Sequence, residues 1–107
     1  MGALIDLLRV LNWLPADRYI EGQAASHAVM RTFHDAAYLD ALIRANDPKC
    51  DHARLRETFK IGTLDNPIYP GLYERTTLLV GNALLAAELA YERKAPVFFA
   101  AGGTHHG

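Results

Sequence analysis

From Gly2 to Leu14 the chain is almost continuously hydrophobic, and only Asp6, Arg9 and Asn12 interrupt the apolar run. Their three-residue spacing places these polar side chains on one narrow strip of a helix. The pattern predicts an N-terminal helix that has most of its circumference available for packing. We expect it to end at Pro15, because proline cannot continue an α-helix. Residues 16–25 are predicted to be extended or looped.

Two shorter helices are predicted next. Ser26 is placed to cap a helix that runs to about Phe33, and Asp35 is placed to cap a second one over residues 36–45. Asn46-Asp47-Pro48 ends the second helix, since the residue before a proline disfavours helical geometry. Residues 47–70 are polar and rich in proline, and we predict a long loop with one helix-compatible patch over 52–59.

The strongest element spans about residues 72–93, where apolar side chains occupy nearly every face of the predicted helix. All-round apolarity predicts burial on all sides. The run is too short and too interrupted to cross a bilayer, which needs about 20 apolar residues. The segment that follows, about 96–100, is β-branched and aromatic and predicts a short strand, which would need a pairing partner. We therefore expect a mainly α chain with one or two short strands.

Length and charge narrow the class of protein. With 107 residues and a net charge of −1, the chain is expected to form a single domain over residues 1–107. Basic and acidic residues are interspersed, so neither nucleic acid nor a membrane surface is expected as a partner. The single cysteine, Cys50, has no internal disulfide partner, and the N-terminus lacks a signal-peptide pattern. Both features favour a cytoplasmic protein.

Candidate chemistry concentrates at His105 and His106, which follow the predicted strand and the pair Gly102-Gly103. A strand that enters a tight glycine turn directs the next side chains toward a sheet edge. Two adjacent imidazoles can share acid and base roles, because each titrates near neutral pH. Taken alone, the pair is also compatible with a solvated polar tail.

The remaining polar candidates favour structural roles. Cys50 and His52 are two potential metal ligands, but a structural zinc site needs four. His27 and His34 lie on predicted helices, where packing or capping is expected. Asp65 lies in an Asp-Asn-Pro sequence that is typical of turns.

Three segments in one order resemble a known family. They are "FHDAAYLDAL" (33–42), "GTLDNPIYPGLYERTTLLVGNALLAAE" (62–88) and "AGGTHH" (101–106). Their order and spacing resemble the N-terminal part of the histone deacetylase superfamily, which includes acetoin-utilisation proteins and acetylpolyamine amidohydrolases. The resemblance covers nearly the whole chain.

This resemblance implies a partial piece of the α/β arginase–deacetylase fold and zinc-dependent hydrolysis of acetyl-amide bonds. It implies that His105 and His106 are the acid–base pair and that Asp65 binds substrate amides at the pocket rim. Gly102 and Gly103 would shape the pocket wall. The family's zinc ligands follow the tandem histidines, and none can be placed in this chain. The resemblance therefore leads us to expect a truncated domain that binds no cofactor and is inactive alone.

Two other functions stay open. The chain could be one half of a split deacetylase, completed by a separate C-terminal half. It could also be a small helical interaction module without enzymatic activity. For the truncated domain we expect a homo-oligomer formed through the apolar helices, because these helices lack the sheet that normally covers them and are left exposed.

Overall fold

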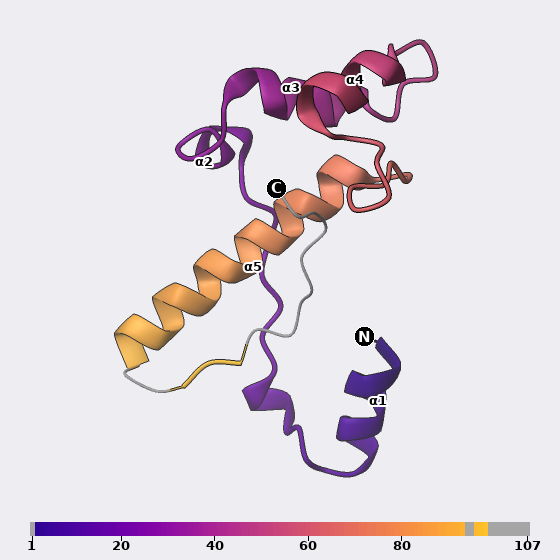
Figure 1. Ribbon diagram of the computed structural model, residues 1–107. Coiled ribbons are helices and arrows are strands. Elements are labelled where there is room, and N and C mark those ends of the chain that lie inside the picture. The colour runs from indigo at the N-terminus through magenta and orange to yellow at the C-terminus, as the bar shows by residue number, and fades with distance from the viewer. Residues whose placement is uncertain (1, 94–95, 99–107) are drawn as a thin grey trace.

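The structure is a computed structural model that describes residues 2–93 and 96–98. It is mainly helical, as predicted, and the described residues contain no strand (Figure 1). Its elements are α1 (Gly2–Val10), a 3₁₀ turn (Ala16–Arg18), α2 (His27–Met30), α3 (Ala36–Arg44), α4 (His52–Phe59) and α5 (Leu72–Arg93). Residues 96–98 are irregular, so the strand predicted over 96–100 is not confirmed; its last two residues lie outside the described part.

Side-chain caps set the start of the three short helices. Ser26 Oγ accepts a hydrogen bond from the Val29 amide at 3.2 Å, and Asp35 Oδ1 accepts one from Ala37 at 2.8 Å. Both predicted caps are therefore confirmed. Asp51 caps α4 in the same way, so a regular helix forms inside the segment predicted to be a long loop.

The first helix ends at Val10 and does not continue to Leu14. Asn12 adopts the left-handed conformation with a φ of 56°, and the Trp13 amide donates to the Leu8 carbonyl at 2.9 Å. Asparagine is one of the few residues that tolerate this conformation at a helix end. The helix therefore stops at its own C-cap, before Pro15 is reached.

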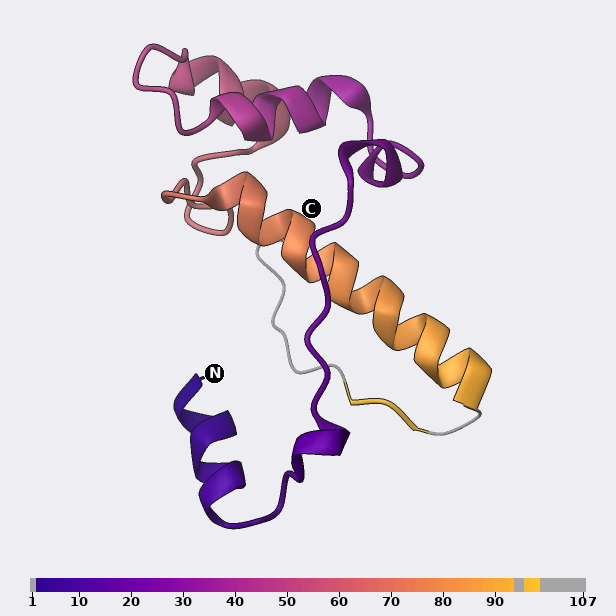
Figure 2. The same ribbon diagram turned by 180° about the vertical axis from the view of Figure 1, so that it is seen from behind.

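The core lies where α3 packs against α4 and α5, and α2 adds to it from the side of α5 (Figures 1 and 2). Its buried side chains are Met30, Leu39, Ala41, Leu42, Ala45, Leu55, Ile61 and Leu72. Removing these apolar surfaces from water is the main stabilising contribution at this end of the molecule.

The segment between the 3₁₀ turn and α2 crosses α5 at close range (Figure 2). The Gly22 amide donates to Asn82 Oδ1 at 2.9 Å, and the Ala25 amide donates to the Thr77 carbonyl at 2.8 Å. Gly81 lies directly beneath the crossing, where a Cβ atom would overlap the Gln23 backbone. The missing side chain of Gly81 therefore permits the contact.

Burial of α5 on all sides, as its sequence predicts, does not occur in this chain. Leu78 and Leu84 are 46% and 45% exposed, and no residue of α1 is buried. The radius of gyration is 16.5 Å, compared with about 13 Å for a compact domain of this length. The accessible surface of 8108 Å² exceeds the roughly 5,900 Å² expected for a compact monomer of this mass. No helix in the described part is both long enough and apolar enough for a membrane span.

Candidate functional site

Of the five residues to which the resemblance assigns a role in the site, Asp65 is the one that falls within the described part. It is exposed in the connection between α4 and α5. His105, His106, Gly102 and Gly103 lie outside the described residues. The geometry of the candidate site is therefore the geometry of the turn that carries Asp65.

Residues 60–66, called here the 60–66 turn, form a hydrogen-bonded reversal after α4. Lys60 ends the helix with a φ of 60°, and Gly62 has a φ of 89°, a region that glycine occupies without strain. The Gly62 amide donates to the Asn66 carbonyl at 2.7 Å. The Thr63 hydroxyl donates to the Lys60 carbonyl at 3.1 Å and accepts from the Asn66 amide at 3.2 Å. These bonds hold both ends of the turn and leave its tip in solvent.

The turn is also tied to α5. After Asn66, which is 5% exposed, the chain passes through Pro67 to Pro70 with Ile68 and Tyr69 packed against the core. Gly71, with a φ of 77°, then leads into α5, and its carbonyl accepts from the Arg75 amide at 2.9 Å. The position of Asp65 is therefore set by α4 on one side and by α5 on the other.

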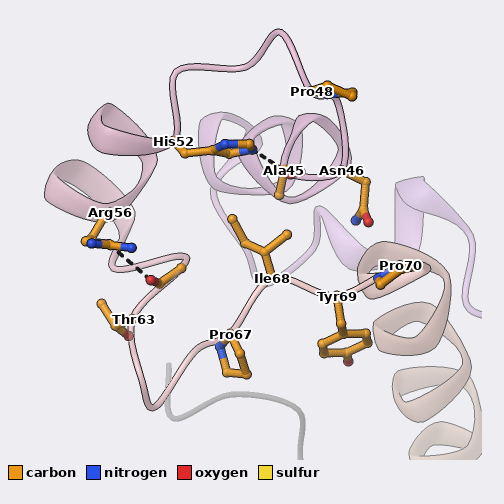
Figure 3. A pocket seen from close by; sticks show the side chains of 11 residues that line it. Ala45, Asn46, Pro48, His52, Arg56, Thr63, Pro67, Ile68, Tyr69 and Pro70 are labelled. Carbon is orange, nitrogen blue, oxygen red and sulfur yellow. Dashed lines mark hydrogen bonds between the residues drawn. The ribbon is translucent and has the colours of Figure 1, made fainter.

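An open pocket of about 560 Å³ lies beside this turn, between the end of α3, α4 and residues 62–70 (Figure 3). Ile68 points into the space below the two helices, and Arg56 lies at its edge (Figure 3). His52 Nε2 donates to the Ala45 carbonyl at 3.0 Å, which assigns the ring proton to that nitrogen. Arg56 Nε donates to the Gly62 carbonyl at 3.1 Å. Among the residues that line the pocket, Arg56 carries a permanent charge and none is a carboxylate.

Two buried polar atoms in the described part have no hydrogen-bond partner, and both belong to the connection between α4 and α5. They are Asn66 Oδ1 and the Tyr69 hydroxyl. Buried polar atoms in proteins are nearly always paired, so leaving these two unpaired costs free energy in the described structure.

The other reactive side chains have structural roles. His27 Nδ1 is 2.8 Å from the Tyr73 hydroxyl, which links α2 to α5. His34 contacts the rings of Phe33 and Tyr38. Burial raises the pKa of Tyr38 above its usual value of 10.0, because the phenolate is poorly solvated there.

The described residues do not form a metal site. Residues 2–93 and 96–98 contain no group of three or more His, Cys, Asp or Glu side chains that could hold a metal ion. Cys50 packs half-buried against the core, and its neighbours Asp51 and His52 are engaged with α4 and α3. The described residues therefore do not fit the zinc that the resemblance implies, and we assign no metal-dependent step to them.

The sequence analysis missed Arg56 and Thr63, which hold the 60–66 turn. Arg56 lies on a helix that was predicted as a patch within a loop, and Thr63 has no sequence signal that separates it from other loop threonines. Both side chains donate hydrogen bonds to backbone carbonyl groups three or six residues away. The pattern of hydrophobic and polar residues contains no information about such hydrogen bonds.

Comparison with known proteins defines the class. The sequence model of the histone deacetylase domain matches residues 1–107, and the chain belongs to this family. The matched region corresponds to the N-terminal part of the domain.

One relative is the acetoin utilization protein AcuC of Bacillus subtilis (strain 168), which is 32% identical over 105 residues. The match covers 95% of this chain and 26% of AcuC, so the chain spans about a quarter of the length of this relative. No solved structure matches the chain.

Proposed function

We propose that residues 1–107 form the N-terminal part of the catalytic domain of a zinc-dependent deacetylase that hydrolyses acetyl-amide bonds. The observation that carries this proposal is the family match over the entire chain. The exposed position of Asp65 on a hydrogen-bonded turn supports it, because a rim residue must reach substrate. In this proposal α5 lies against the parallel sheet of an arginase–deacetylase fold, and residues 96–100 form one of its strands.

The roles follow the chemistry of the side chains. Asp65 accepts hydrogen bonds from amide N–H groups of the substrate, and a carboxylate is a strong acceptor for such donors. His105 and His106 transfer protons to and from the reacting amide, while Gly102 and Gly103 leave space beside them.

The 107 residues are inactive alone in this proposal. General acid–base catalysis by a histidine pair contributes about 10²–10⁴-fold. In zinc hydrolases the metal activates water and polarises the carbonyl, and the described residues offer no ligand set for it. The pair would therefore act without the larger part of the catalytic apparatus.

A chimera tests the proposal. Residues 1–107 replace the matched quarter of AcuC, and release of acetate from an acetyl-lysine peptide is measured for the chimera, for AcuC and for the 107-residue chain. We expect activity in the chimera, lost by about 10²-fold or more in its H105A and H106A variants, and none in the chain alone. An inactive but folded chimera beside an active AcuC would contradict the proposal. Turnover by the 107-residue chain alone would contradict the expectation that it is inactive, but it would leave the assignment to a deacetylase domain unchanged.

A second candidate function is a self-associating helical module. The exposed apolar side chains of α1 and α5, among them Leu4, Leu7 and Leu84, favour it. A split deacetylase completed by a separate C-terminal half is the third possibility. A cellular phenotype that survives substitution of both histidines by alanine would favour the module over either deacetylase.

A further inference from the structure

Arg56 and the 60–66 turn are joined by a hydrogen bond that crosses from α4 to the loop. Arg56 Nε donates to the Gly62 carbonyl at 3.1 Å (Figure 3). The amide of the same glycine donates in the other direction, to the Asn66 carbonyl at 2.7 Å. Gly62 is therefore held on both sides of its α-carbon, once by the turn itself and once by the helix before it.

The tip of this turn projects into solvent although its base is fixed. Leu64 is 100% exposed and Asp65 is exposed, whereas Ile61 and Asn66 on either side are 0% and 5% exposed. An exposed tip on a fixed base holds its side chains in a narrow range of positions. Because these side chains are already ordered, they lose less conformational entropy when a ligand binds.

We propose that Arg56 is a positioning residue for Asp65. It fixes the Gly62 carbonyl, and through the turn it holds the Asp65 carboxylate where the amide N–H groups of an acetylated peptide can reach it. This inference rests on the proposed function, because that function gives Asp65 its role. Arg56 itself does not contact substrate; its guanidinium acts only through the backbone of the turn.

The first test measures order in the turn of the 107-residue chain. Amide hydrogen exchange of Gly62 is followed by NMR in the unsubstituted chain, in R56Q and in the matched control R54Q. Arg54 lies on the same helix, and its side chain is exposed. Losing one solvent-exposed, charge-assisted hydrogen bond should speed Gly62 exchange by about three- to tenfold in R56Q and leave it unchanged in R54Q. Equal exchange in all three proteins would overturn the proposal.

The second test links the turn to substrate and uses the AcuC chimera described above. We expect R56Q to raise KM for the acetyl-lysine peptide with little change in kcat, and D65N to raise it further. If Arg56 acts through Asp65, adding R56Q to D65N should not raise KM again. Additive effects would overturn the positioning role alone, whereas an unchanged KM in D65N would overturn the role proposed for Asp65.

Discussion

His52 illustrates, at the scale of single residues, how a side chain with ligand chemistry is used structurally. Its Nε2 proton is donated to the carbonyl of Ala45, the residue that ends α3. Asp51 before it caps α4, and Cys50 packs against the core. Helix ends leave carbonyl and amide groups unpaired, and polar residues at these positions satisfy them. The Cys-Asp-His sequence thus joins two helices.

Tyr38 provides a prediction about pH. Because its pKa is raised in the folded state, the folded protein holds the phenol proton more tightly than the unfolded chain does. Its contribution to stability is complete below the unfolded pKa of about 10 and is lost as pH rises toward the folded pKa. We expect the free energy of unfolding to fall above about pH 10, and to fall less steeply in Y38F. Urea titrations between about pH 8 and 11 measure this.

Y91F is the control for this experiment. Tyr91 lies on α5 and is 86% exposed, so burial does not act on its ring. The pH dependence of Y91F should follow that of the unsubstituted chain. A Y38F variant with the same alkaline slope as Y91F would show that burial of Tyr38 has no effect on stability.

At the scale of elements, the crossing over α5 explains a glycine in the middle of a long helix. Glycine usually weakens a helix interior by about 1 kcal/mol relative to alanine. Glycine is nevertheless needed at position 81, because the backbone of residues 23–25 lies where a Cβ atom would be. Asn82 then adds a hydrogen bond to Gly22 beside the contact.

Gly81→Ala tests this close approach. In an open helix the substitution would stabilise the protein, but here the new methyl group overlaps the Gln23 carbonyl and must displace the crossing segment. We expect a loss of about 1–3 kcal/mol in the free energy of unfolding, measured by urea denaturation. Gly2→Ala in α1 has no atom within 4 Å of the added Cβ, so it should be neutral or slightly stabilising. A stabilised G81A would contradict the observed crossing.

At the scale of the whole molecule, the chain has more apolar surface than its single core buries. The core joins α2, α3, α4 and the start of α5, while α1 and the later turns of α5 keep leucines in solvent. Exposed apolar area of this extent is characteristic of surfaces that contact further protein. In a complete deacetylase domain the rest of the chain would cover it, and in the isolated chain a second copy would.

Self-association of the isolated chain is therefore predicted. Light scattering should give a mass at least twice the 11.8 kDa of the monomer, falling on dilution. Replacing Leu7 and Leu84 by lysine should shift the protein toward monomer, because charges on the contact surface oppose association. L64K is the control, since Leu64 is fully exposed on the 60–66 turn and lies on neither helix. A clean monomer at every concentration would contradict this prediction.

The sequence by itself determined the helices whose signals are local. Ser26 and Asp35 cap the helices predicted to follow them, and the apolar run predicted α5 over its observed length. Three segments in a characteristic order along the chain, 33–42, 62–88 and 101–106, were sufficient to recognise the family that the domain comparison shows. Caps and apolar periodicity act within a few residues, so they can be read along the chain.

Tertiary structure alone decided the contact of α4 with the core, the crossing at Gly81 and the hydrogen bond from Arg56 to Gly62. Leu55 is buried because α3 packs against α4, and this contact makes residues 52–59 part of the core. The residues on either side of Leu55 in the sequence are polar and give no local sign of this burial. The Gly22–Asn82 hydrogen bond joins residues 60 positions apart. Such contacts depend on which surfaces meet after folding, and the free energy that selects them comes from packing and long-range hydrogen bonds rather than from local propensity.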